Sequence, residues 1–281
     1  MAGDLHCHTK LSDGSMGIEE LIALAKGAGL KSIAITDHDT LAGAMRGKIL
    51  GERAGLQVIP GVEFSCQDKK TGRKAHLLCY MPEYPDRLQG LCKEISDKRK
   101  IAGQKMATEV MRRYPIPSSL IVKWATGSTN IYKVHIMSAL IDAGYTTAVY
   151  GRLYERLFNS ESGIAKTEID YPDIRDVIPQ IHEAGGLAVL AHPYVYDNVE
   201  LIDELAGLGL DGVEVWHPSC DEEKVNTLIG IAKKHDLCMT GGSDFHGMYC
   251  DKPTPIGSAT APDIFVERLI AAKKRLLKIG I

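Results

Sequence analysis

The chain has 281 residues, of which 44% are hydrophobic and 25% charged, and its net charge of −3 comes without any basic tract. These values are typical of a globular protein and argue against a surface dedicated to nucleic acid. No apolar run approaches the roughly 20 residues that span a bilayer, and the seven scattered cysteines include no CxxC pair, which excludes a zinc ribbon and a disulfide framework. Since the first residues also lack a charged region followed by an apolar one, the expected location is the cytoplasm.

Short β-like runs alternate with helical patterns in the first eighty residues. The apolar periods predict strands at 4–9, 31–39, 56–65 and 74–81, with amphipathic helices at 16–30 and 42–55. The pattern then becomes charged and helical, at 86–114, 132–145 and 148–159. After about residue 170 the alternation returns, with strands at 187–193, 212–218 and 238–247 and helices at 174–186, 199–210, 221–236 and 263–277.

Seven strands, each followed by a helix or a substitute for one, predict an α/β fold, a TIM-like (β/α) barrel. A doubly wound sheet is the alternative, but it needs a glycine-rich phosphate turn after its first strand, where this chain carries histidines. We interpret residues 83–168 as an inserted helical subdomain that caps the substrate, between barrel segments 1–82 and 169–281.

Potential metal ligands lie at the end of nearly every predicted strand. In a strand, residues i and i+2 face the same way, so His6 and His8 share a face and Cys7 packs behind it. This pair alone could be a satisfied polar pair. The carboxyl ends of barrel strands meet at one rim, however, and that rim also receives Asp37, His38, Asp39, Glu63, His76, His192, His217, Asp244 and His246. So many imidazoles and carboxylates around one cavity would be costly without a cation, and nitrogen with oxygen ligands suits Mn²⁺, Fe²⁺ or Zn²⁺.

The segments "HCH", "TDHD", "GVEFS", "AHL", "AHP" and "GGSDFHG", in this order, resemble the PHP family (polymerase and histidinol phosphatase). More narrowly, the chain resembles free-standing bacterial PHP phosphoesterases with a helical insertion. The resemblance implies a distorted seven-stranded barrel and three divalent metal ions, Mn first and Fe or Zn as alternatives. The implied ligands are His6, His8, Glu63 and Asp244 for one ion, Asp13, His38 and His246 for a second, and Glu63, His76 and His192 for a third.

The resemblance further implies that a metal-bridging hydroxide attacks phosphorus in a small phosphorylated metabolite, such as a nucleotide, a sugar phosphate or a cyclic phosphodiester. The alternatives are a histidinol-phosphate phosphatase, a 3′–5′ exonuclease on short nucleic-acid ends, and a metal-stabilised scaffold of the kind attached to polymerases. The last is disfavoured by the full ligand set. The oligomeric state is left open.

The chain departs from these relatives at two positions near the substrate. Where they carry arginine in an R-x-H element that binds phosphate, this chain has "KVH", with Lys133 and His135, and where they carry histidine it has Cys220. Lysine keeps the charge but loses the planar fork of arginine. Lys133, His135 and His217 are the expected substrate contacts, and His217 is also the candidate proton donor to the leaving oxygen. Further candidates are Arg152 and Lys166 for substrate, and Asp37 and Asp39 as acceptors that orient His38 or its neighbours; Asp39 could instead cap the next helix.

Overall fold

A computed structural model describes residues 2–159 and 163–279 and has one eight-stranded sheet at its centre. The strands are β1 (Ala2–Cys7), β2 (Ser32–Ile35), β3 (Gln57–Gln67), β4 (Lys74–Tyr80), β5 (Leu187–Leu190), β6 (Gly212–Trp216), β7 (Cys238–Gly241) and β8 (Ala261–Pro262). Their order in the sheet is β7-β6-β5-β4-β3-β2-β1-β8. The seven predicted strands are therefore all present, and the two-residue β8 adds an eighth that is too short to leave a periodic signal.

The sheet curls until its two ends nearly meet. Cys7 and Phe245 form a parallel bridge beyond β1 and β7. The amide of His8 donates to the carbonyl of Phe245 at 2.9 Å, and the amide of Phe245 donates to the carbonyl of His6 at 3.2 Å. The barrel is mixed, because β3, β4 and β5 run antiparallel while the remaining neighbours among β1 to β7 are parallel. The predicted α/β barrel is confirmed.

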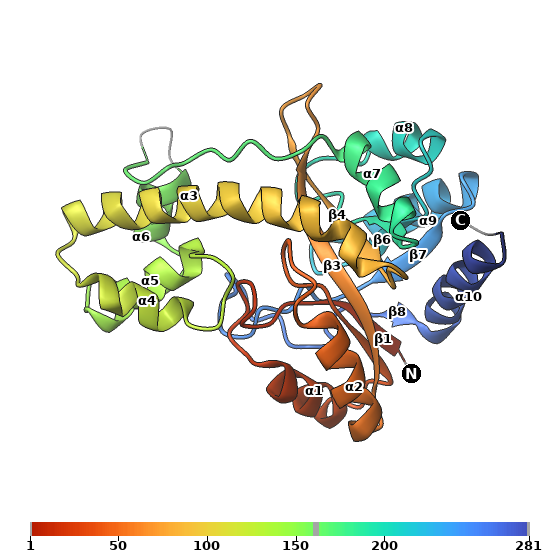
Figure 1. Ribbon diagram of the computed structural model, residues 1–281, viewed down its shortest axis with the longest axis horizontal. Helices are drawn as coiled ribbons and strands as arrows, with labels where there is room; N and C mark the ends of the chain where they lie inside the picture. Colours follow the sequence, from red (N-terminus) through yellow and green to blue (C-terminus); the bar gives the residue numbers. More distant parts are fainter. Residues whose placement is uncertain (1, 160–162, 280–281) are drawn as a thin grey trace.

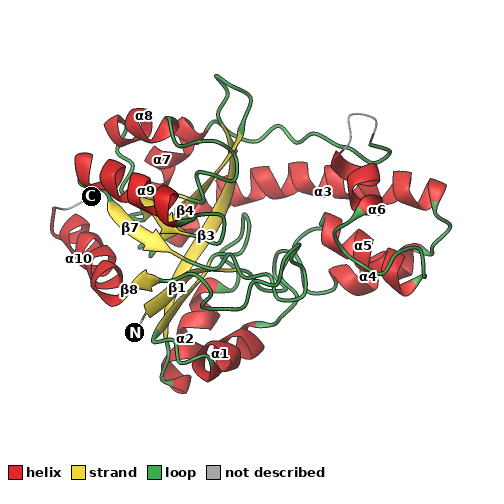
Figure 2. Cartoon of the chain, turned by 180° about the vertical axis from the view of Figure 1, so that it is seen from behind, coloured by secondary structure: helices red, strands yellow, loops and turns green. Residues whose placement is uncertain are grey.

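Helices cover the outside of the barrel, as Figures 1 and 2 show from opposite sides. They are α1 (Ile18–Gly27), α2 (Ala44–Ala54), α7 (Ile174–Glu183), α8 (Leu201–Gly207), α9 (Glu222–Lys234) and α10 (Asp263–Ile279). In α7 the buried residues Ile174, Val177, Ile178 and Ile181 follow the spacing of one helix face. Asp173 begins this helix by accepting the amide of Arg175. Within the described ranges, no helix is both long and apolar enough to cross a membrane.

A helical segment extends to one side of the barrel, on the left in Figure 1. After the short 3-10 helix η1 (Pro85–Leu88) it contains α3 (Gln89–Arg113), α4 (Ser118–Ala125), α5 (Lys133–Asp142), α6 (Arg152–Tyr154) and a π-helical turn, η2 (Glu155–Asn159). The segment has its own apolar core, in which Val110, Ile136 and Leu157 are buried. The helices predicted at 86–114 and 132–145 are present as α3 and α5. The helix predicted at 148–159 is shorter and consists of α6 and η2, and α4 was not predicted. The domain boundaries at 83 and 169 stay predictions.

Candidate metal centre

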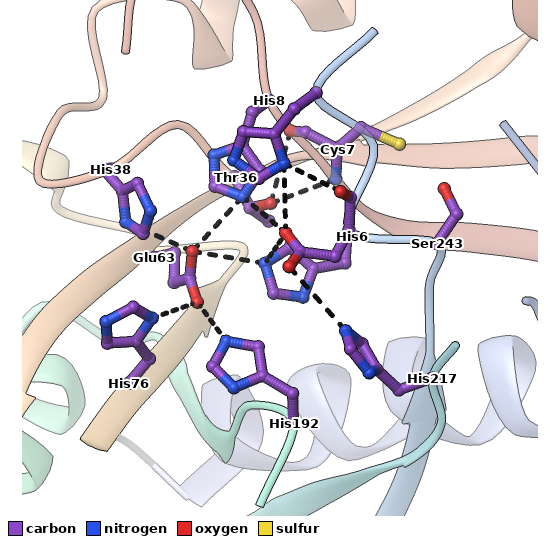
Figure 3. Close-up of polar contacts among 12 residues, drawn as sticks. His6, Cys7, His8, Thr36, His38, Glu63, His76, His192, His217 and Ser243 are labelled. Atoms are coloured by element: carbon purple, nitrogen blue, oxygen red, sulfur yellow. Dashed lines mark hydrogen bonds and ion pairs between the residues drawn. The ribbon is translucent and has the colours of Figure 1, made fainter. Parts of the chain in front are cut away.

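Glu63 lies at the centre of the barrel rim, surrounded by five histidine rings (Figure 3). Its Oε2 atom is 3.2 Å from His6 Nε2, from His8 Nε2 and from His38 Nδ1. Its Oε1 atom is 2.7 Å from His76 Nδ1 and 2.8 Å from His192 Nε2. The expectation that His6 and His8 face the same way is confirmed, since both approach one carboxylate oxygen.

Two aspartates complete the ring of polar groups. Asp244 Oδ1 is 3.2 Å from His8 Nε2 and 3.5 Å from His6 Nε2. Asp13 lies on the other side of His8, with Oδ1 3.3 Å from His246 Nε2 and Oδ2 3.8 Å from His38 Nε2. The structure thus brings all nine expected ligands to one place.

Three overlapping groups have potential ligand atoms within 4.8 Å of one another. They are His6, His8, Glu63 and Asp244; His8, Asp13, His38 and His246; and His38, Glu63 and His76. The expected grouping differs from this in two respects. His8 and His38 each belong to two groups, and His192 reaches Glu63 without joining any of the three. The role of each residue as a ligand stays a prediction.

The chemistry of this cluster fits bound cations. Within the described part of the chain, several buried atoms have no hydrogen-bond partner although opposite charges lie close by: His6 Nε2, His8 Nε2, His38 Nδ1, His192 Nδ1, Asp13 Oδ1 and Glu63 Oε2. An unsatisfied buried polar atom costs about 1–3 kcal/mol, so a cluster of them in the core of a barrel needs a reason. Lone pairs of nitrogen and oxygen that converge without hydrogen-bond geometry are an arrangement suited to divalent ions.

The protonation equilibria show the same attraction for positive charge. Burial by itself would raise the pKa of Glu63, but the surrounding histidines hold it well below its usual range. Burial would lower the pKa of His8, yet Asp244 and Glu63 raise it to about 10. Burial prevails at two neighbouring rings, because it lowers the pKa of His38 to about 4 and also lowers the pKa of His76. A divalent cation would displace any proton held by a ring such as that of His8 and release it.

Asp37 and Asp39 hold segments that carry or adjoin the expected ligands. Asp37 accepts hydrogen bonds from the amide and hydroxyl of Thr9 and from the hydroxyl of Ser12, each at 2.7 Å. Asp39 accepts from the amide of Ser65 at 2.8 Å and from Arg99 Nη2 at 2.7 Å. Neither makes a hydrogen bond with the ring of His38. The alternative prediction, that Asp39 caps the next helix, is wrong, because α2 begins after Gly43.

Glu214 is a buried carboxylate that the sequence reasoning missed. It lies on β6 with no exposed surface, 3.0 Å from His6 Nδ1, and it accepts the amide of His192 at 2.8 Å. Asp4 similarly binds the amide and hydroxyl of Ser243 behind the cluster. The only signal in the sequence was a single acid inside each of two apolar strands, "GVEVW" and "GDLH".

A cavity of about 770 Å³ opens beside the cluster, with lining residues from both the barrel and the helical segment. Asp13, His38 and His76 form its wall on the metal side, and Lys133 and Lys166 are among its other lining residues. Its volume is that of a typical small-molecule site. Arg152 is exposed and does not line this cavity.

Two expected substrate residues lie elsewhere. His135 is 2% exposed, and its Nδ1 accepts the amide of Tyr132, so the ring helps to begin α5. His217 Nδ1 accepts the amide of Ser219, and its Nε2 is 3.7 Å from Asp244 Oδ2. Neither ring lines the cavity. Cys220 does not line it either, and its sulfur lies 3.9 Å from the hydroxyl of Ser219. Their roles in binding substrate stay predictions.

Residues 4–185 match the family described as the PHP domain. The chain belongs to the PHP domain family. Among curated proteins it is 37% identical to a phosphoribosyl 1,2-cyclic phosphate 1,2-diphosphodiesterase of Eggerthella lenta, over 89% of this chain and 95% of that relative. It is 30% identical to a 5′-3′ exoribonuclease of Haemophilus influenzae, over 86% of this chain and 89% of that enzyme.

A solved structure has the same fold as this PHP chain. It comes from Bifidobacterium adolescentis and is assigned as a metal-dependent phosphoesterase. It aligns with a TM-score of 0.85 and 28% identity, covering 96% of this chain and 95% of its own. The expected family and barrel are therefore confirmed, and so is the expected class of enzyme, since these relatives cleave phosphoesters. The number and identity of the metal ions stay predictions.

Proposed function

We propose that this protein hydrolyses the phosphate ester of a small phosphorylated metabolite, a nucleotide, a sugar phosphate or a cyclic phosphodiester, at a centre of divalent metal ions. The observation that carries the proposal is the ring of nine buried or partly buried histidine, aspartate and glutamate side chains, with unpartnered ligand atoms, beside a cavity whose lining includes lysines. The 37% identity to a cyclic phosphate diesterase supports the substrate class.

The nine residues would hold the ions, with Glu63, His8 and His38 shared between neighbouring positions. We propose three ions, with Mn²⁺ as the native metal and Fe²⁺ or Zn²⁺ as alternatives. Bound there, divalent ions lower the pKa of water and neutralise charge on a phosphoryl group. The chain itself positions the ligands: Asp37 holds the loop that carries His8 and Asp13, and Glu214 holds His6 from behind.

His217 is our candidate proton donor, although its ring does not line the cavity. Its Nδ1 accepts the amide of Ser219, so in the neutral ring the proton lies on Nε2, which faces Asp244. We propose that this N–H supplies the proton that the leaving alcohol needs. Lys133 lines the cavity and would attract a phosphate group of the substrate. Residues 83–168 would then act as the substrate cap.

The alternatives find less support. A relative named as an exoribonuclease works in the 5′–3′ direction, opposite to the 3′–5′ exonuclease considered from the sequence. The net charge of −3 also gives little attraction for a polyanion. No relative reported above is named as a histidinol phosphatase, and the lysines of the cavity are suited to a substrate with further anionic groups.

The test is a substrate panel with metal-free and Mn²⁺-loaded protein. It should contain a nucleoside monophosphate, a sugar phosphate, a cyclic phosphodiester, histidinol phosphate and a short oligoribonucleotide. We expect Mn²⁺-dependent release of phosphate or ring opening with one of the first three, and loss of it in Asp13→Asn. Equal activity in the metal-free protein, or activity confined to the oligonucleotide, would refute the proposal.

A further inference from the structure

The loop between β1 and α1 carries the expected ligand Asp13. Its neighbour Ser12 has no exposed surface, and the hydroxyl of Ser12 donates to Asp37 Oδ1 at 2.7 Å. The amides of Ser12 and Gly14 both donate to the carbonyl of Thr9, at 3.1 Å and 3.0 Å. Each of these bonds involves the barrel or the loop itself, so together they hold the loop from the barrel side.

Two further hydrogen bonds reach this loop from the helical segment. The hydroxyl of Ser128 donates to the carbonyl of Ser12 at 2.6 Å. The amide of Thr129 donates to the carbonyl of Leu11 at 2.9 Å. Both donors lie in the α4–α5 connection, which consists of residues 126–132. The helical segment therefore binds the residue that directly precedes Asp13, although the two lie more than a hundred positions apart in the chain.

The α4–α5 connection is itself held firmly by α3. Asn130 is 6% exposed, and its side-chain NH₂ group donates to Ser96 Oγ on α3 at 2.9 Å. At Gly103 the same helix passes so close to the connection that an added Cβ would lie 2.5 Å from the carbonyl oxygen of Ile131. Because the connection is fixed in this way, we expect a movement of the segment to be passed on through Ser128 to the loop below it.

The segment also contacts the loop that carries His38. The ring of Tyr132 stacks on the ring of His38, with 6.4 Å between their centres, and Arg99 Nη2 on α3 lies 2.7 Å from Asp39 Oδ2. His38 and Asp13 belong to the same possible metal group, in which His38 Nε2 lies 3.8 Å from Asp13 Oδ2. The segment thus touches two loops whose expected ligands face each other.

We propose that Ser128 is a positioning residue that holds Asp13 in place for metal binding. The helical segment is then part of the metal centre as well as the substrate cap. The inference rests on the proposed function, because it needs the ion which that function uses. Ligand side chains must be held within about 0.5 Å of their productive geometry, and a loop held from one side only leaves Asp13 more freedom. The coupling is reciprocal, so an ion bound by Asp13 and His38 should also fix the segment against the barrel.

The first measurement is the affinity for Mn²⁺, from a competition titration against a chelator of known affinity. Ser128→Ala removes the donor to the carbonyl of Ser12, and it should raise the Kd of one Mn²⁺ ion about threefold to tenfold, as expected for one lost hydrogen bond. Ser128→Thr keeps the hydroxyl and should restore the parent Kd. Thr126→Ala is the matched control, because the hydroxyl of Thr126 donates to the carbonyl of Val122 inside the segment, at 2.8 Å.

A double-mutant cycle separates the positioning of Asp13 from a general effect on the fold. In an Asp13→Ala background, Ser128→Ala should change Mn²⁺ affinity less than twofold, because the ligand that Ser128 positions is gone. Hydrogen exchange tests the reciprocal effect. Saturating Mn²⁺ should slow exchange of the Thr129 amide in the parent, and at least threefold less in Ser128→Ala.

Neither measurement needs turnover. If the parent cleaves no phosphoester but these changes in affinity and exchange are seen, the proposed function fails and the positioning role of Ser128 stands. Three results would overturn that role even in an active enzyme: a Kd in Ser128→Ala less than threefold above the parent, an equal loss in Thr126→Ala, or an equal loss in the Asp13→Ala background. A parent that binds no Mn²⁺ would overturn it as well.

Discussion

Replacing Glu214 by glutamine tests whether the carboxylate behind His6 supports metal binding. One oxygen of Glu214 lies 3.0 Å from His6 Nδ1 and the other accepts the amide of His192 at 2.8 Å. Glutamine keeps the shape of the side chain but has only one oxygen. Either the ring N–H of His6 or the backbone N–H of His192 must then face the NH₂ group of the amide. The lost hydrogen bond to a charged acceptor amounts to about 1.5–3 kcal/mol, which is roughly tenfold to a hundredfold in metal affinity. Substitutions behind metal-binding histidines typically weaken affinity by the same range.

The assay is a competition titration of Mn²⁺ between the protein and a chelator of known affinity. Asp211→Asn is the matched control, because Asp211 also binds a histidine and an amide, His182 Nε2 at 2.8 Å and Ala188 N at 2.7 Å, outside the metal cluster. We expect weaker Mn²⁺ binding in Glu214→Gln alone. The reasoning is refuted if the Kd of Glu214→Gln stays within threefold of the parent, or if Asp211→Asn weakens binding equally.

Further predictions concern the ions and the cavity. Elemental analysis after expression with added metal should find more than one transition-metal ion per chain, because nine ligands exceed the needs of one ion; one ion or fewer contradicts this. Asp244→Ala and His38→Ala should each abolish turnover, and activity within tenfold of the parent, in a protein with native circular dichroism, would count against the metal centre. With a pKa of about 8, lowered by burial and Lys74 against the weaker effect of Glu155, Lys133 loses its charge as pH rises, so kcat/KM should fall above pH 8. Lys133→Arg should remove this alkaline limb, since guanidinium stays protonated; a limb that persists would assign it to another group.

The metal cluster could be predicted because its residues follow apolar strands directly. His6 lies near the end of β1, and His38 and His192 follow β2 and β5, so the parallel strands bring them to one rim. Glu63 lies within β3, just after the part of that strand that pairs with β2. The antiparallel β4 joins the rim in a different way, through the inward side chain of His76 in the middle of its hairpin.

The supporting groups could not be predicted, since their partners are distant in the chain. Glu214 looked like any single acid in a strand, and nothing in the sequence connects it with His6. The pairing of Arg99 with Asp39 depends on how α3 crosses the barrel. His135 fits a phosphate-binding pattern, but its ring is used to cap α5, a local hydrogen bond that spacing alone cannot distinguish from a contact with substrate.

The near-closure of the barrel between β1 and β7 has a consequence for folding. The expected ligands His6 and His8 lie on or just after β1, whereas Asp244 and His246 follow β7. The bridge of Cys7 with Phe245 joins these two segments. Contacts between such distant parts of a chain form late, because closing a long loop costs entropy before the contact stabilises anything. During synthesis, His6 and His8 can therefore meet Asp244 and His246 only after the segment that follows β7 has been made. An ion bound by residues from both segments would stabilise the closed barrel. It should therefore lower the unfolding rate more than it raises the folding rate.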